Sequence, residues 1–352
     1  MKKTSTRLAD GRELIHYDLR DDVVREAADL RPLAPVATTA EIRADRLLGD
    51  FVAIASHRND RTYHPPADAC PLCPSRGGRL SEIPDSSYDV VVFENRFPSL
   101  AGDSGRCEVV CFTSEHEASF ADLSPAQARL VLDAWTDRTA ELSHLPSVAQ
   151  VFCFENRGAE IGVTLAHPHG QIYGYPDITP RTALMLRSLG AHKAATGHNL
   201  FDELLTEELS EGRRVVLEGE HWAAFVPYAA HWPYEVHLYP RRRVPDLLAL
   251  DEPARAEFPR IYLELLRRFD RIFGPDQPPT PYVSAWHQAP FTALGGHGVE
   301  RADFALHLEL FTIRRMSGKL KFLAGSESGM SAFINDVPPE TAAERLREVA
   351  ST

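Results

Sequence analysis

The chain has 352 residues, of which 43% are apolar and 25% are charged, a balance typical of a globular protein large enough for two domains. Its net charge of −12 at pH 7 gives no overall basic field, so we expect neither a nucleic-acid nor an anionic-membrane partner. The sequence has no apolar run of about 18 residues and no apolar signal segment at its start, which predicts a chain without a membrane span. Five cysteines, an odd number, fit reduced cytoplasmic thiols better than a disulfide framework.

The first half of the sequence predicts strands and one long helix. Ser124 is a good helix cap, Pro125 suits the first helical position, and apolar residues then recur at helical spacing. The strand-like runs of this half lie at 50–56, 88–94, 107–112 and 150–155.

The second half repeats this order of elements. A helix is predicted from the cap at Asp251 to Gly274, and helical patterns in 178–212 are interpreted as a linker between the halves. The strands of this half are predicted at 213–220, 221–228, 235–240, 281–290 and 303–313. We therefore predict an α+β fold of two duplicated halves, 1–180 and 181–352, each an antiparallel sheet with a long helix packed on it. Two unrelated α/β domains are the alternative.

A metal site is indicated by the sequence CPLC. The spacing of Cys70 and Cys73 lets two thiolates bind one zinc ion, and His116 and His167 are candidates for the other two ligands. A closed site with two cysteines and two histidines leaves no open position for substrate, so its role would be structural. A redox pair and two unrelated cysteines in a turn are the alternatives.

The stretch HPHGQ, residues 167–171, carries the candidate reactive group. Residues two apart on an extended backbone point the same way, so His167, His169 and Gln171 are expected on one face. If His167 binds zinc, His169 remains as a nucleophile, and Gln171 can donate its amide to a phosphoryl oxygen. A buried pair of hydrogen-bonded histidines is the alternative.

The run ENRGAEIGVTLAHPHGQ with the upstream CPLC resembles the galactose-1-phosphate uridylyltransferase family, the transferase branch of the histidine-triad superfamily. The segments SHRNDRTYHPP, VVFENRFPSL, WHQAPF and KLKFLAGSE extend the resemblance from about residue 45 to the C-terminus. It implies two histidine-triad-like half-barrel domains and a homodimer with shared active sites. It also implies a ping-pong reaction, in which UDP-glucose gives UMP to a histidine and releases glucose 1-phosphate. Galactose 1-phosphate then takes the UMP to form UDP-galactose.

The resemblance also implies roles for individual residues. His169 would be the nucleophile, and His167 would bind zinc while its backbone carbonyl orients the ring of His169. The first domain would carry this machinery, and the second would contribute sugar contacts. The implied substrate-binding residues are Arg58 (from the partner subunit), Arg61, Asn95 at the uracil, Asn156, Thr164, Gln171, and Lys321, Phe322 and Glu327 near the sugar across the dimer.

Two departures from the family bear on substrate choice. Arg96 and Ser326 stand where well-known members carry Asp at the ribose and Tyr at the sugar. An ADP-sugar phosphorylase or adenylyltransferase that uses the same histidine chemistry is therefore one alternative. A non-catalytic nucleotide-binding sensor is an alternative of another class.

A second metal site is implied in the second half, where family members hold iron or zinc with three histidines and a Glu. This chain offers His287, His307 and Glu309, with Glu309 in place of the third histidine. A mixed set of histidine and carboxylate ligands can bind either metal. The alternative is a simple hydrogen bond between His307 and Glu309.

Overall fold

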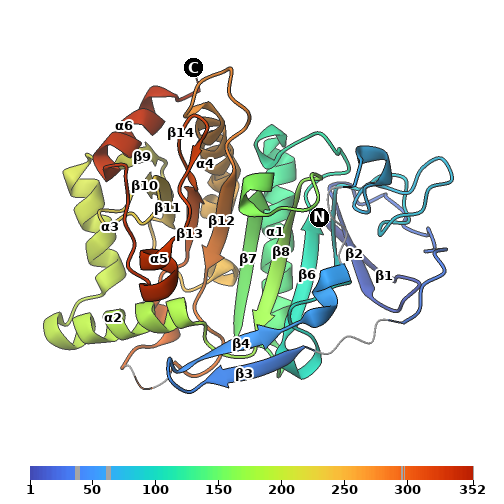
Figure 1. Cartoon of the computed structure of the whole chain (residues 1–352), viewed down its shortest axis with the longest axis horizontal. Helices are drawn as coiled ribbons and strands as arrows, with labels where there is room; N and C mark the ends of the chain where they lie inside the picture. The colour runs from blue at the N-terminus through green and yellow to red at the C-terminus, as the bar shows by residue number, and fades with distance from the viewer. Residues whose placement is uncertain (36–39, 61–64, 295, 297, 352) are drawn as a thin grey trace. The chain divides into compact units, whose positions relative to one another are not determined.

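The computed structural model describes residues 1–35, 40–60, 65–294, 296 and 298–351, apart from the side chains of residues 59 and 60 (Figure 1). The chain divides into two compact units. Unit 1 comprises residues 1–153, 164–183 and 290–293, and unit 2 comprises 154–163, 184–289 and 294–352. Each unit combines antiparallel strands with a long helix, which confirms the predicted α+β class.

The sheet of unit 1 has the strand order β1-β2-β5-β6-β8, and every neighbouring pair is antiparallel. The hairpin of β3 and β4 forms a separate two-stranded sheet. The first three strands, β1 to β3, were not predicted from the sequence, whereas β4, β5, β6 and β7 match predicted runs. The elements of this unit are β1 (Lys2–Arg7), β2 (Glu13–Asp18), β3 (Glu41–Asp45), β4 (Asp50–Ile54), β5 (Val90–Glu94), β6 (Arg106–Cys111), α1 (Pro125–Ser143) and β8 (His169–Tyr175). The strand β7 (Gln150–Arg157) and the helix α2 (Pro180–Thr196) pass from unit 1 into unit 2.

Helix α1 begins where its sequence predicts. The Ser124 hydroxyl accepts a hydrogen bond from the Gln127 backbone N–H at 3.1 Å, and Pro125 occupies the first turn. The helix packs against β2, β5 and β8. Trp135, which is buried, stacks on Phe120 with the ring centroids 5.9 Å apart. This packing places a rigid helix behind the strand that begins at His169.

The CPLC loop is embedded in the core of unit 1. Cys70 and Leu72 are buried with residues of β2, β5 and β6, among them Leu14, Val91 and Val109. Burial against three strands removes conformational freedom from the loop. The two thiols are therefore held at fixed positions beside the sheet.

Unit 2 repeats this plan with its own strands. Its sheet has the order β12-β13-β11-β10-β9, and the second half of β7 pairs with β12. The Asp251 carboxylate caps α4 by accepting from the Ala254 N–H at 3.0 Å, as the sequence predicts, and α4 packs on β9 and β10. No helix in the described part of the chain is long and apolar enough to cross a membrane. The elements are α3 (Leu200–Glu211), β9 (Val215–Glu218), β10 (Trp222–Phe225), β11 (Tyr234–Pro240), α4 (Glu252–Arg271), β12 (Tyr282–His287), β13 (His307–Thr312), β14 (Arg314–Met316), β15 (Lys319–Leu320), α5 (Gly325–Met330) and α6 (Pro339–Glu348).

A buried carboxyl group lies on β7 within unit 2. Glu155 is 4% exposed, and among the described residues its Oε2 atom has no hydrogen-bond partner. Burial raises the pKa of Glu155 to about 8, although the nearby positive charge of Arg157 works in the opposite direction. The folded chain therefore binds a proton here at neutral pH, which an unfolded chain with an ordinary carboxyl pKa would release.

This difference predicts that the chain loses stability as pH rises from about 4.5 to about 8, and Glu155→Gln should remove that loss. Between pH 5.5 and pH 8, the free energy of unfolding of the parent chain should fall by roughly 2–3 kcal/mol more than that of Glu155→Gln. Urea unfolding at both pH values measures the effect. Glu207→Gln, on the exposed surface of α3, is the matched control and should follow the parent. If the free energy of unfolding changed equally between the two pH values in the parent and in Glu155→Gln, Glu155 would not hold a proton in the folded chain.

Candidate functional site

His169 is the first residue of β8, and its ring has a fixed orientation. Its Cα lies opposite that of Cys111 in β6, and its Nδ1 atom donates to the backbone carbonyl of His167 at 2.7 Å. This bond places the proton on Nδ1 and the lone pair on Nε2. Burial lowers the pKa of His169 below its usual value, against the opposing effect of the His167 carbonyl. The ring is therefore neutral at pH 7, the form in which imidazole acts as a nucleophile.

A cavity of about 640 Å³ opens beside this ring. The described residues that line it all belong to unit 1. Five of the residues predicted to act together line it, namely His169, Gln171, Arg58, Asn95 and Thr164. A volume of this size accommodates a nucleotide.

Several polar side chains of the cavity wall are fixed by hydrogen bonds. The Tyr173 hydroxyl donates to Oε1 of Gln171 at 3.2 Å, so the NH₂ end of that amide is the one that can donate to a phosphoryl oxygen. Arg58 donates to the Phe97 carbonyl at 3.1 Å and to the Ser99 hydroxyl at 2.6 Å. The resemblance assigned Arg58 to a partner's site, whereas here it lines the cavity of its own chain.

The four predicted zinc ligands form one cluster in unit 1. The ligand atoms of Cys70, Cys73, His116 and His167 all lie within 4.8 Å of one another. The Cys73 Sγ atom is 3.3 Å from Nδ1 of His116 and 3.5 Å from Nδ1 of His167. Ligands about 2.0–2.3 Å from a tetrahedral zinc ion are separated by roughly 3.5 Å, which matches these distances.

The electrostatics of this cluster also fit a bound cation. Burial raises the pKa of Cys70 to about 11, and the neighbouring Cys73 adds to the increase. Burial lowers the pKa of His167 to about 4, so its ring is neutral and able to act as a ligand. A divalent cation would offset the cost of two buried thiolates. The residues present therefore fit a structural zinc ion.

His167 differs from the predicted arrangement in one respect. The strand begins at His169, so His167 does not follow the alternation that places His169 and Gln171 on one face. Its side chain is 1% exposed and turns toward Cys73 instead. The expectation that all three side chains share a face was wrong, because the extended strand starts two residues later than the motif.

A second cluster of histidines and carboxylates lies on three neighbouring strands of unit 2. His287 on β12 is opposite His307 on β13, and Glu309 on β13 is opposite His237 on β11. The Glu309 carboxylate is 3.3 Å from Nε2 of His287, 3.6 Å from Nε2 of His237 and 3.7 Å from Nε2 of His307. Glu235 accepts from the same nitrogen of His237 at 2.9 Å. Three imidazoles thus surround one carboxylate.

The charges of this cluster are consistent with metal ligands. Burial alone would raise the pKa of Glu309, but the facing histidines outweigh it and hold that pKa well below its usual value. Burial lowers the pKa of His307 to about 4, and its Nδ1 donates to the Ala305 carbonyl at 2.8 Å, so Nε2 carries the lone pair. Glu235 and His237 were not predicted from the sequence. The available signal was their spacing of two on a strand that neighbours β13.

Comparisons with known proteins identify the family. The family described as galactose-1-phosphate uridyl transferase matches with its N-terminal domain over residues 99–179 and its C-terminal domain over 186–352. A galactose-1-phosphate uridylyltransferase from Streptomyces lividans is 71% identical, covering 99% of this chain and 98% of the relative. The chain belongs to the galactose-1-phosphate uridylyltransferase family. A relative of that name from Thermotoga maritima is 35% identical, covering 88% of this chain and 98% of the relative.

Solved structures agree with this family assignment. A structure described as that of a uridylyltransferase has a TM-score of 0.75 and 30% identity, covering 88% of this chain and 98% of the other. An ADP-glucose phosphorylase from Arabidopsis thaliana with bound ADP-glucose has a TM-score of 0.67 and covers 89% of this chain and 100% of the other. At 21% identity, this second likeness shows the shared fold alone.

The remaining residues that the family resemblance implied lie elsewhere. Asn156, on β7, belongs to unit 2, as do Lys321, Phe322 and Glu327, and none of these is among the described residues that line the cavity. Lys321 donates to the Glu327 carboxylate at 2.9 Å, while Phe322 is 73% exposed. Arg61 lies outside the described residues. The sugar-contact roles of these residues stay predictions.

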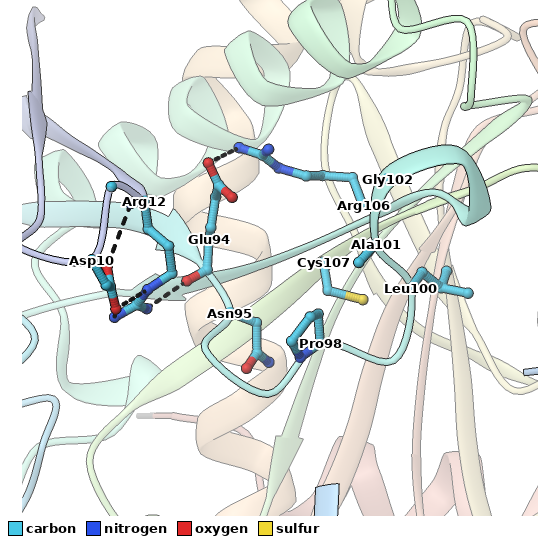
Figure 2. Close-up of a pocket in the computed structure, with 11 residues that line it drawn as sticks. Asp10, Arg12, Glu94, Asn95, Pro98, Leu100, Ala101, Gly102, Arg106 and Cys107 are labelled. Atoms are coloured by element: carbon cyan, nitrogen blue, oxygen red, sulfur yellow. Dashed lines mark hydrogen bonds and ion pairs between the residues drawn. The ribbon is translucent and has the colours of Figure 1, made fainter. Parts of the chain in front are cut away.

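A hollow of about 300 Å³ lies beside Asn95, a residue that also lines the larger cavity. Figure 2 shows the residues that line this hollow. Arg12 donates to the Glu94 carbonyl at 2.8 Å and pairs with Asp10, and Arg106 lies 3.0 Å from the Glu94 carboxylate (Figure 2). Both cations of this hollow are therefore neutralised by carboxylates. The cavity at His169 is therefore a better phosphate site than this hollow.

Proposed function

We propose that the chain is a UDP-glucose–hexose-1-phosphate uridylyltransferase that carries UMP on His169. One observation carries the proposal. His169 lines a cavity of nucleotide size, and its Nδ1–H is donated to the His167 carbonyl, which leaves the lone pair on Nε2. Family membership and the 71% identity with a relative named for this activity support the choice of reaction.

In the first half-reaction, Nε2 of His169 attacks the α-phosphorus of UDP-glucose. A P–N bond forms, the bond from that phosphorus to the bridging oxygen breaks, and the electron pair leaves with glucose 1-phosphate. The imidazole becomes positively charged, and the bond from Nδ1–H to the His167 carbonyl strengthens as this charge develops. The leaving group is a stable phosphate anion, so it needs no proton from a general acid.

In the second half-reaction, a phosphate oxygen of galactose 1-phosphate attacks the same phosphorus. The P–N bond breaks, UDP-galactose leaves, and neutral His169 returns. The Gln171 amide would donate to a phosphoryl oxygen, and the Arg58 guanidinium would pair with the diphosphate. Both steps use one cavity, because the two hexose phosphates bind in turn.

The first domain, with the nucleophile and the structural zinc, would carry the chemistry, and the second would supply sugar contacts in a homodimer with shared sites. Exposed apolar side chains support such an interface. Leu47 and Leu48 at the tip of the β3–β4 hairpin are 92% and 73% exposed, and Met330 of unit 2 is 79% exposed. A cytoplasmic location is supported by five cysteines that form no disulfide.

The cluster around Glu309 is proposed to hold a second ion, iron or zinc. His237 supplies a third imidazole, which was not predicted from the sequence, so three histidines face the Glu309 carboxylate. Such a ligand set suits either metal. Glu235 contacts the same nitrogen of His237 that faces Glu309, so its carboxylate is a further candidate ligand.

The test is the mass of the intact protein after exposure to UDP-glucose. We expect a covalent UMP adduct on His169, located by peptide mapping, and its discharge by galactose 1-phosphate to give UDP-galactose. ADP-glucose in a parallel sample should give no adduct. The opposite preference would favour an ADP-sugar phosphorylase. No adduct with either nucleotide, together with nucleotide binding, would favour a non-catalytic sensor.

A further inference from the structure

Tyr88, which precedes β5, directs its hydroxyl into the metal cluster of unit 1. The side chain is 4% exposed. Its hydroxyl oxygen lies 2.7 Å from Nε2 of His167, and its O–H donates to the Leu72 carbonyl at 3.0 Å. The Cys111 side chain also interacts with the hydroxyl. Sequence motifs gave no reason to single out this tyrosine.

The hydroxyl connects two segments that carry ligands. Leu72 lies between Cys70 and Cys73, and His167 immediately precedes the strand that starts at His169. The single O–H of Tyr88 is used on Leu72, so its oxygen accepts from the N–H at Nε2 of His167. One side chain thereby links the CPLC loop to the HPH segment.

The same contact decides which nitrogen of His167 faces the metal position. Nε2 also lies 2.8 Å from the Thr113 carbonyl, which can only accept a hydrogen bond. With the proton on Nε2, the lone pair is on Nδ1, which points at Cys73. Groups that hold the non-ligating nitrogen of a histidine fix its ring and tune the metal site.

We infer that Tyr88 is a positioning residue that couples the metal cluster to the nucleophile, an inference that rests on the proposed zinc site and the proposed reaction. His167 is held at one nitrogen by the metal cluster and at the other by Tyr88 and Thr113. Its backbone carbonyl is placed as a result, and that carbonyl orients His169 through a bond of 2.7 Å. Tyr88 is not itself among the described residues that line the cavity, although its hydroxyl donates to Leu72, which is one of them. Tyr88 reaches the nucleophile through His167, which it contacts directly.

The test compares Tyr88→Phe with Tyr17→Phe. Both changes remove one hydroxyl from a buried tyrosine of unit 1. Tyr17 lies on β2, and its hydroxyl donates to Asp137 at 2.7 Å, a bond that involves no residue of the metal cluster. In Tyr88→Phe we expect zinc release to a chelator to be about 10-fold faster and kcat to fall about 10-fold. KM for UDP-glucose should stay unchanged, because no substrate contact is lost. The visible spectrum of the cobalt-loaded protein should also shift, which a general loss of stability would not cause.

The outcomes distinguish a failure of this inference from a failure of the proposed zinc site or the proposed reaction, on which it rests. A parent protein that retains no metal, or forms no adduct, would refute the proposed site or reaction before Tyr88 is considered. A parent that holds zinc and transfers UMP, with Tyr88→Phe identical to Tyr17→Phe in metal release, kcat and cobalt spectrum, would overturn the inference alone. Equal losses of kcat in both variants would assign the effect to the fold rather than to positioning, and would overturn it as well.

Discussion

Replacing His169 by glycine is expected to reduce uridylyl transfer by at least about 10⁴-fold, because no other group in the described cavity wall is placed to form the P–N bond. The UMP adduct should disappear from the intact-mass spectrum after exposure to UDP-glucose. Zinc content and the thermal midpoint should stay close to those of the parent. The His167 ligand and the backbone carbonyl that faces His169 both remain in the variant.

His144→Gly is the matched control for this loss. His144 is an exposed histidine at the end of α1, so the same side chain is removed from the same unit without touching the cavity. It should transfer UMP at the parent rate. An active His169→Gly variant that still forms an adduct would move the nucleophile to another residue and end the mechanism. A variant that lost both metal and fold would instead show that His169 is a structural residue.

The sequence predicted the elements that carry strong local signals. Helix α1 begins at its Ser124–Pro125 cap and α4 at Asp251, because capping side chains satisfy backbone N–H groups in any tertiary context. Cys70 and Cys73 were predicted to share one ion because of the CPLC spacing, and the structure brings them together with His116 and His167 in a group that could hold a metal. Strand β1, Lys2–Arg7, was missed because its side chains are largely polar and it lies at the edge of the sheet.

The parts of the sites that the sequence did not predict depend on contacts between distant segments. Tyr88 reaches a ligand 79 positions away, and a lone tyrosine carries no spacing signal. His237 joins the second cluster only because β11 neighbours β13 in a register that places it opposite Glu309. Strand order and register are set by tertiary packing, so one sequence read without its fold does not reveal them.

The departure at Arg96 shows the same limit. Its guanidinium lines the cavity, where family members carry Asp, and it lies 3.9 Å from the buried carboxylate of Glu82. The sequence shows that this position has no carboxylate. It does not show that a carboxylate from elsewhere in the chain lines the same cavity.

After the loss of transfer in His169→Gly, the next largest effect is expected from removing Cys73, which should reduce metal binding and stability. In Cys73→Ala the zinc would lose the thiolate that lies 3.3 Å and 3.5 Å from the two histidine ligands. We expect loss of the structural zinc and a fall in the thermal midpoint of about 4 °C, equivalent to roughly 3 kcal/mol for a chain of this size. Transfer should fall as well, because His167 loses the anchor that places its carbonyl against His169.

Cys153→Ala separates the metal effect from the cost of removing a buried sulfur atom. Cys153 on β7 is fully buried, and its sulfur lies 4.0 Å from the Thr139 hydroxyl rather than among metal ligands. Metal analysis and differential scanning calorimetry of the two variants give the comparison. Metal at the Glu309 cluster should survive in Cys73→Ala, because its ligands all belong to unit 2. Equal midpoints for the two variants, or a parent free of zinc, would show that the cluster is held by packing alone and needs no ion.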